Sequence, residues 1–357
     1  MPFIPLYGQQ SLRDRLGEAA RRGTLPQSLL LHGARGGGKQ RVALWLAQAL
    51  LCERTNPPCG ECRHCRYVLD ATHPDLVWIF PRPRPKEGEP EMEDVRNDLL
   101  EAAHERAEEH GLYAAPSGSE GIFVATSRWL VQRASITPAL AKRKVFVVGD
   151  ADRMVPQEGS EAAANAFLKL LEEPPDNTFL ILTTSALGAL LPTIRSRVVA
   201  VRVPPMPDRD VRAFLEDDQV RAAMKEGKLP ADLDQLTSLA AGSPGRLLSA
   251  GTKGAAMDEG RRFIDAATGG DRATILRTAF AQGNSGARGE FFDMLDAVTV
   301  QLHTRVKDAT ERDDERFALA ASRAISLVEE AKLMASGNVN PSLISARLLQ
   351  DLAATLR

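Results

Sequence analysis

The chain has 357 residues, 43% of them hydrophobic and 26% charged, with a formal net charge of −2. This composition is typical of a globular protein of two or three domains, and the small net charge excludes a chain that binds nucleic acid over its whole surface. Aromatic residues are only 5% of the chain, which argues against a base-stacking platform. No apolar run reaches the ~20 residues of a membrane span, and residues 1–5 do not resemble a signal peptide. We therefore expect a cytoplasmic protein with no membrane contact.

A glycine-rich loop near the N-terminus predicts a nucleotide site. Residues 29–40, LLLHGARGGGKQ, read as a buried strand, a loop and the start of a helix at about Arg41. Gly33 and Gly38 let backbone N–H groups turn toward a phosphate, and the helix N-terminus adds the positive end of its dipole. Lys39 stands where P-loops place the lysine that reaches the β- and γ-phosphates. The next residue should be Ser or Thr to hold Mg²⁺, but it is Gln40.

All four cysteines of the chain follow within fourteen residues, at Cys52, Cys59, Cys62 and Cys65. Thiolates two residues apart can turn toward one tetrahedral ion, and a cytoplasmic protein does not normally use them as disulfides. The spacing predicts a structural zinc site closed by four thiolates; the alternative is a set of incidental thiols. His64 and His73 lie nearby, and we interpret them as solvated or capping residues in preference to ligands.

A second strand is expected over residues 144–148, followed by the acidic turn Gly149-Asp150-Ala151-Asp152. In P-loop ATPases an Asp at the end of this strand orders Mg²⁺, and the next acidic residue polarises the attacking water. If the strand ends at Val148, Gly149 occupies the metal position and Asp150 the water-activating one. A shift of one residue would make Asp150 the metal ligand, and the sequence leaves both registers open.

Further buried strands alternate with helices over the first ~200 residues, which predicts a parallel sheet covered on both faces. The prolines at 204–207 mark a domain boundary, and the rest of the chain reads as almost entirely helical. We expect an α/β domain, a small helical domain and an all-α domain, at residues 1–203, 204–252 and 253–357. The first would include the cysteine module, residues 52–65, and a charged surface insertion, residues 81–120, with an exposed helix.

Three motifs in the α/β region carry a resemblance: AANAFLKLLEEPP at 163–175, TFLILTT at 178–184 and LLPTIRSR at 190–197. With the cysteine module after the P-loop helix, they resemble the clamp-loader subunits of bacterial DNA polymerase III, in the AAA+ superfamily, and within these the delta-prime family. The resemblance is weakest over 81–120 and in the first half of the helical domain. It implies an AAA+ P-loop domain, a helical lid and a helical collar that joins subunits.

The resemblance also implies a function and roles for individual residues. Clamp loaders use ATP to open a sliding clamp and place it on primer-template DNA; this chain would be a noncatalytic stator, part of the DNA polymerase III holoenzyme, with gamma/tau and delta subunits as partners. Arg197 matches an arginine finger that acts on a neighbour's ATP. Arg246 matches a second sensor arginine, although a plain helix-surface arginine fits equally well. Thr183 and Thr184 match a first sensor region, or are structural.

Two other functions compete. A catalytic clamp-loader ATPase of the gamma/tau kind is disfavoured by Gln40 and Gly149, because Mg²⁺ would lose both protein anchors. A P-loop phosphotransferase with a zinc lid would need an acceptor pocket and a working Mg²⁺ site. We expect structural Zn²⁺, no Mg²⁺ and no ATPase activity of the chain's own. Whether ATP or ADP binds is left open.

Overall fold

The computed structural model describes residues 3–83, 90–113, 120–154, 161–224, 232–251, 254–281, 288–336 and 340–356. These residues divide into two compact units. The first holds the described residues up to Ala223, together with Gly242–Arg246. The second holds those of Met224–Ala241 and from Leu247 onward. The division into three domains at 204 and 253, and the collar role of the last, stay predictions.

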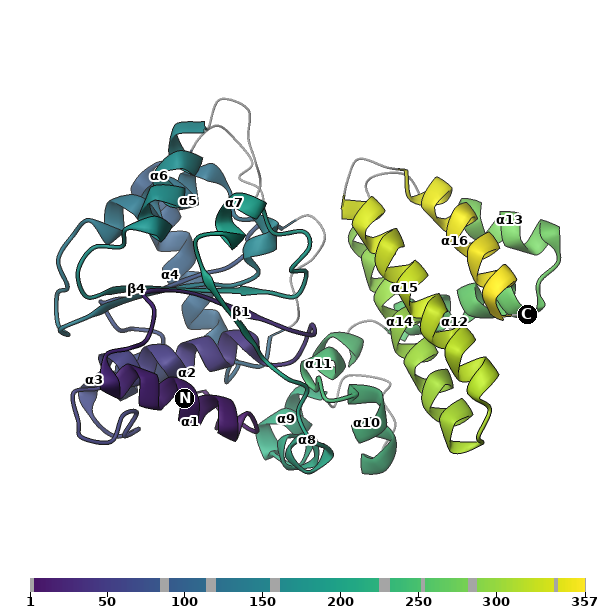
Figure 1. Ribbon diagram of the computed structural model, residues 1–357, viewed down its shortest axis with the longest axis horizontal. Coiled ribbons are helices and arrows are strands. Elements are labelled where there is room, and N and C mark those ends of the chain that lie inside the picture. Colours follow the sequence, from purple (N-terminus) through teal and green to yellow (C-terminus); the bar gives the residue numbers. More distant parts are fainter. Residues whose placement is uncertain are drawn as a thin grey trace. The chain divides into compact units, whose positions relative to one another are not determined.

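The first unit is built on a five-stranded parallel sheet in the order β2-β3-β4-β1-β5 (Figure 1). Its strands are β1 Ser28–His32, β2 Leu76–Ile79, β3 Lys144–Val148, β4 Thr178–Thr184 and β5 Val199–Arg202. Side chains of a strand alternate between the two faces of a sheet, and here both faces are buried. Leu29 and Leu31 pack in one core cluster, whereas Leu30 between them packs in another. The predicted AAA+-type α/β fold, with a parallel sheet covered on both faces, is confirmed.

Helices cover the two faces of this sheet (Figure 1). They are α1 Gln10–Arg22, α2 Lys39–Leu51, α3 Arg63–Leu69, α4 Met92–Glu108, α5 Val124–Ala134, α6 Glu161–Glu172 and α7 Pro192–Arg195. Two further helices, α8 Asp208–Leu215 and α9 Asp218–Met224, follow β5 in the chain. Helix α2 begins at Lys39, two residues earlier than expected, because Gly38 before it takes the left-handed conformation (φ +78°) that ends the loop. The parallel strand ends, the P-loop and the acidic turn after β3 therefore lie at one edge of the sheet.

The charged insertion differs from the expected exposed helix. Along α4, Val95, Leu99 and Ala102 recur at helical spacing and are buried in the core clusters of the sheet. Arg106 also turns inward, and its guanidinium carbon lies 3.4 Å from the ring centroid of Phe80. The other charged residues of this helix are exposed. The helix therefore closes the core beside β2. Residues 84–89 and 114–119 of the insertion lie outside the described residues.

The second unit is helical throughout its described part. Its helices are α10 Leu233–Ala240, α11 Gly245–Gly251 (which begins in the first unit), α12 Gly254–Gly269, α13 Arg272–Ala281, α14 Arg288–Glu311, α15 Glu315–Ser336 and α16 Pro341–Leu356. Phe263, Phe291 and Leu302 are among the fully buried residues of its core. Among the described helices of the whole chain, none is long and apolar enough to cross a membrane.

Candidate functional site: a P-loop and a four-cysteine centre

The P-loop lysine is held by the loop that carries it. The Lys39 Nζ donates to the carbonyl oxygens of Gly33 and Ala34, at 3.1 and 2.8 Å, and to the Ser185 hydroxyl at 2.8 Å. An ammonium group has three N–H donors, so these contacts use all of them. Lys39 is 6% exposed, and this burial lowers the pKa of its ammonium to about 8 despite the nearby Asp150. The charge that would reach a phosphate is engaged within the protein.

Gln40 occupies the place where a metal anchor is expected. Its amide Nε2 donates to an oxygen of the Asp150 carboxylate at 2.9 Å, and its Oε1 accepts from the indole N–H of Trp78 at 3.1 Å. The same side chain fills the space above Gly149: a Cβ built there would lie 2.5 Å from the Gln40 Cδ. Strand β3 ends at Val148, which is the register that puts Gly149 at the metal position. Both altered positions are therefore in contact with each other.

Asp150 lies between this glutamine and the end of β4. Its backbone is left-handed (φ 48°), and its N–H donates to the Thr183 hydroxyl at 3.0 Å. Burial, and next the charge of Asp152, raise the pKa of the Asp150 carboxyl, while Lys39 opposes the rise. Thr183 and Thr184 are both fully buried, and the Thr184 hydroxyl donates to the Asp152 carboxylate. The structure thus brings Lys39, Asp150 and Thr183 together, with both threonines in strand-end hydrogen bonds.

The segment that carries Arg246 packs directly on the P-loop. The Gly245 N–H donates to the Gly36 carbonyl at 3.0 Å, and the Arg246 Nε donates to the Arg35 carbonyl at 3.3 Å. Gly36 is left-handed (φ +77°), and a Cβ on it would lie 2.6 Å from the Arg246 backbone nitrogen, so only glycine allows this approach. Gly33 is likewise confined, because a Cβ there would lie 2.4 Å from the backbone oxygen of Val203, the residue after β5. The structure therefore places Arg246 at the P-loop, and its role as a second sensor stays a prediction.

Arg197, the candidate finger, lies just beyond α7. One guanidinium nitrogen, Nη2, lies 2.7 Å from the Glu172 carboxylate at the end of α6. The other, Nη1, donates to the Thr193 carbonyl at 2.8 Å and approaches the Ser196 hydroxyl at 3.2 Å. The side chain is 27% exposed. Within the described residues its polar contacts are all with α6 and α7, and none is with the P-loop.

The four cysteines converge as their spacing predicts. The Sγ atoms of Cys59 and Cys65 lie 3.9 Å apart, as do those of Cys52 and Cys62, and all four lie within 4.8 Å of one another. Four sulfurs that each lie ~2.3 Å from a tetrahedral zinc are about 3.8 Å apart. The donor set and its geometry therefore fit one metal ion. The left-handed Gly60 (φ +77°) forms the turn between Cys59 and Cys62.

Backbone N–H groups prepare these sulfurs to be thiolates. The Cys62 N–H donates to the Cys59 sulfur at 3.3 Å, and the Cys65 N–H donates to the Cys62 sulfur at 3.5 Å. Hydrogen bonds from Cys62 and next from Glu61 lower the pKa of the Cys59 thiol to about 6. Burial instead raises the pKa of the Cys65 thiol. A cation among the sulfurs would offset that cost, because a metal-bound thiol is deprotonated.

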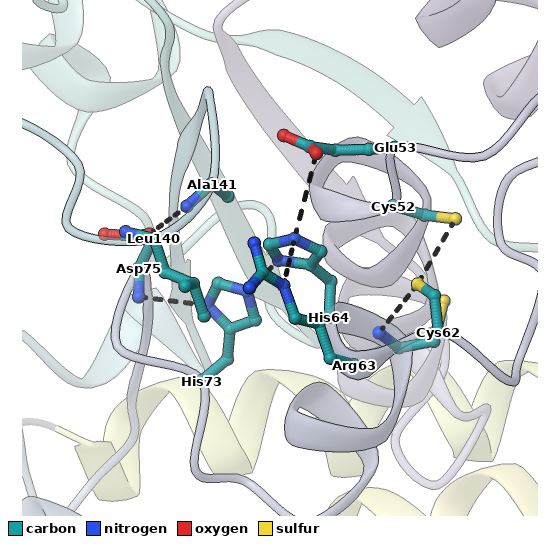
Figure 2. Close-up of polar contacts among 10 residues, drawn as sticks. Cys52, Glu53, Cys62, Arg63, His64, His73, Asp75, Leu140 and Ala141 are labelled. Atoms are coloured by element: carbon teal, nitrogen blue, oxygen red, sulfur yellow. Dashed lines mark hydrogen bonds and ion pairs between the residues drawn. The ribbon is translucent and has the colours of Figure 1, made fainter.

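Two buried histidines, which the sequence pattern did not predict to be buried or paired, lie next to the cysteines (Figure 2). His64 and His73 are each 3% exposed, and the His64 Nδ1 lies 2.9 Å from the His73 Nε2. The solvated role expected for them is wrong. The Asp75 N–H donates to the His73 Nδ1 at 3.0 Å, so the neutral His73 ring carries its proton on Nε2 and donates it to His64. The pair ties α3 to the start of β2.

Asp75 continues this connection into the next loop. Its carboxylate accepts the backbone N–H groups of Ala139, Leu140 and Ala141, at 2.5, 2.7 and 2.7 Å (Figure 2 draws two of these partners). Burial opposes ionisation of this fully buried group, but the three donors prevail and lower the pKa of the carboxyl. The only signal in the sequence was an Asp directly before a buried strand, at a position where a solvated turn residue is equally common.

Comparison with known proteins adds the family. The family model described as DNA polymerase III, delta subunit, matches residues 8–207, more than half of the chain. The delta' subunit of DNA polymerase III from Pseudomonas aeruginosa is 33% identical over 239 residues, 66% of this chain and 58% of that one. The Escherichia coli delta' subunit is 28% identical over 62% of this chain and 53% of its own. The match thus spans little more than half the length of these relatives.

A gamma/tau subunit of DNA polymerase III, from Mycobacterium tuberculosis, is 30% identical over 60% of this chain and 30% of its own length. A crystal structure of a DNA polymerase III gamma subunit-related protein from Thermotoga maritima aligns over 96% of this chain and 100% of that one, with 18% identity and a TM-score of 0.46. From the family-model match, the chain belongs to the family described as DNA polymerase III, delta subunit. This match and the delta' relatives confirm the delta-prime family that the motifs predicted.

Proposed function

We propose that the chain is a noncatalytic stator subunit of a DNA polymerase III clamp loader. It would assemble with gamma/tau and delta subunits, help to place the sliding clamp on primer-template DNA, and supply Arg197 to the ATP of a neighbouring subunit. The family match and the delta' relatives support membership of such a complex. The gamma/tau relatives are as similar in sequence, so the family alone does not separate a stator from an ATPase.

The observation that carries the noncatalytic role is the hydrogen bond from the Gln40 amide to Asp150. In P-loop enzymes a Ser or Thr hydroxyl and a strand-end Asp hold Mg²⁺, and the metal neutralises charge that develops on the phosphates. Here the Gln40 amide stands at the position of the hydroxyl, and Gly149, which has no side chain, stands at the position of the Asp. The Gln40 amide oxygen already accepts from the Trp78 indole, and Gly149 has no side chain, so neither position leaves a free oxygen ligand for Mg²⁺. The phosphotransferase hypothesis needs the same metal, so this contact counts against both alternatives.

Arg197 would act where a neighbour's nucleotide meets the surface at α7. An arginine finger stabilises the charge on the transferring phosphoryl group, and it must lie on the surface to reach another subunit. Arg197 is partly exposed and is held by a short helix and an ion pair. Lys39, by contrast, is buried with all its donors engaged. The contrast supports chemistry at an interface and a loop that preserves the strand-to-helix turn.

The four cysteines would hold a structural Zn²⁺. Four thiolates complete the tetrahedral shell, so the ion would have no open position for water or substrate. Cys52 follows the last turn of α2, and Cys65 lies within α3. The ion would therefore join α3 to the end of α2, the helix that follows the P-loop.

ATP turnover by the isolated chain tests the noncatalytic role. Purified chain with MgCl₂ and ATP should release phosphate no faster than buffer, and Lys39→Ala should change nothing. Turnover that Lys39→Ala abolishes would contradict the proposal and favour the gamma/tau kind of subunit. Thermal unfolding of both proteins provides the control for folding.

A further inference from the structure

Within the described residues, the candidate finger Arg197 makes one ion pair, with the carboxylate of Glu172 on a different helix. Its Oε1 lies 2.7 Å from the Arg197 Nη2. Glu172 is the last residue of α6, whereas Arg197 follows α7, so the pair joins two elements that are 25 positions apart in the chain. The question is what this contact does for the arginine.

The carboxylate is presented by a well-anchored helix end. Leu171, the preceding residue, is 1% exposed, and its carbonyl accepts the Ser28 hydroxyl of β1 at 2.8 Å. Prolines follow at 174 and 175 and prevent the helix from continuing. The end of α6 is thereby tied to the central strand that leads into the P-loop. A group mounted there keeps a fixed position relative to the sheet.

The guanidinium is restrained at both of its terminal nitrogens. The Glu172 carboxylate lies within ion-pair distance of Nη2, and the Thr193 carbonyl and Ser196 hydroxyl accept from Nη1. The Nε is buried, and its N–H has no partner within the described part of the chain. These contacts fix the orientation of a side chain that is still 27% exposed.

We propose that Glu172 is a positioning residue for Arg197: it holds the partly exposed guanidinium in one orientation, ready to meet the phosphate of a neighbouring subunit's nucleotide. This inference rests on the proposed role of Arg197 as a finger. The physical reason is entropic. A free arginine side chain loses rotamer freedom when it binds a phosphate, and a side chain already held in place loses less. The benefit is largest in the transition state, where alignment matters most.

The neighbouring residue Glu173 offers a matched control. It carries the same charge, is exposed, and its N–H donates to the Lys169 carbonyl as the helix ends. Glu172→Gln keeps the size of the side chain and removes its charge; Glu173→Gln makes the same change one position along. Glu172 is 50% exposed on its side chain, so neither variant should lower the thermal unfolding midpoint measurably.

The assay is ATP hydrolysis by the complete reconstituted complex with clamp and primed DNA. Glu172→Gln should lower kcat by about three- to tenfold with an unchanged KM for ATP, and Glu173→Gln should match the wild type. Since salt screens a partly exposed ion pair, the difference between Glu172→Gln and the wild type should shrink as ionic strength rises. A purely structural contact would not produce this kcat effect and salt dependence at an unchanged unfolding midpoint.

Arg197→Ala is run alongside to separate the two claims. If it lowers kcat while Glu172→Gln equals or exceeds the wild-type rate, the positioning role is overturned and the finger stands. If Arg197→Ala has the wild-type rate, the finger is refuted and the positioning role falls with it. An effect of Glu173→Gln as large as that of Glu172→Gln would also overturn the inference, because charge at the end of α6 would then matter without the contact.

Discussion

Gly149→Ala tests the close contact between Gly149 and Gln40, the two altered positions of the candidate nucleotide site. The backbone of Gly149 is not left-handed, so alanine adds only its methyl group and no backbone strain. That methyl would lie 2.5 to 2.6 Å from three atoms of the Gln40 amide. The flexible end of Gln40 must therefore move away, which breaks its hydrogen bonds with Asp150 and Trp78.

The cost can be worked out from the groups that are left behind. Trp78 is 5% exposed, so its indole N–H would be buried without a partner, at about 1–3 kcal/mol. The lost amide contact with Asp150 adds about 1 kcal/mol. We expect Gly149→Ala to lower the free energy of unfolding by about 2–4 kcal/mol. Gln40→Ala removes the same two hydrogen bonds and should cost a similar amount.

The double variant provides the decisive comparison. Without the Gln40 amide there is nothing for the new methyl to displace, so adding Gly149→Ala to Gln40→Ala should cost close to nothing. The coupling energy of the cycle should therefore be about 2–4 kcal/mol. Urea denaturation followed by tryptophan fluorescence measures it, since all three tryptophans, at 45, 78 and 129, lie in the first unit. Additive effects of the two substitutions would refute the contact.

Two further predictions concern the region between the cysteines and β2. Protein purified without chelator should contain about one equivalent of zinc, and its removal should lower the thermal midpoint; an unchanged midpoint in metal-free protein would argue against a structural ion. For Asp75, a lowered folded-state pKa means that ionisation stabilises the fold above the ordinary value of 3.8 and that this contribution is lost as pH falls. Asp75→Asn should therefore cost about 1–3 kcal/mol at pH 7 and progressively less toward pH 3, by urea denaturation; a pH-independent cost would exclude the ionised carboxylate as the cause.

Much of the fold could be predicted because its signals are local. The bounds of β3 agree with the strand expected over residues 144–148, because a short apolar run that ends in an acidic turn is a local signal. The buried strands are short apolar runs, and their alternation with helices implies a parallel sheet. The cysteine centre was also local: four ligands within fourteen residues need only short turns to converge.

The chemistry that the sequence did not show depends on contacts between distant residues. The Gln40 side chain meets Trp78 and Asp150, which lie 38 and 110 positions away. The sequence indicated only that residue 40 is not the Ser or Thr of a P-loop, whereas the structure shows which contacts the Gln40 amide makes instead. The ion pair between Glu172 and Arg197 is of the same kind. The many charged residues of α4 predicted an exposed helix. Its buried face was not recognised, because the buried positions are mostly alanine, a residue found on either face of a helix.

The most direct test of the central claim is the ATPase rate of the reconstituted complex that carries Arg197→Ala in this chain alone. Arg195→Ala, two positions earlier and exposed, is the matched control, and size-exclusion chromatography checks assembly. The account predicts an intact complex whose clamp- and DNA-stimulated rate falls at least about tenfold, with Arg195→Ala at the wild-type rate. An intact Arg197→Ala complex that hydrolyses ATP at the wild-type rate would contradict it.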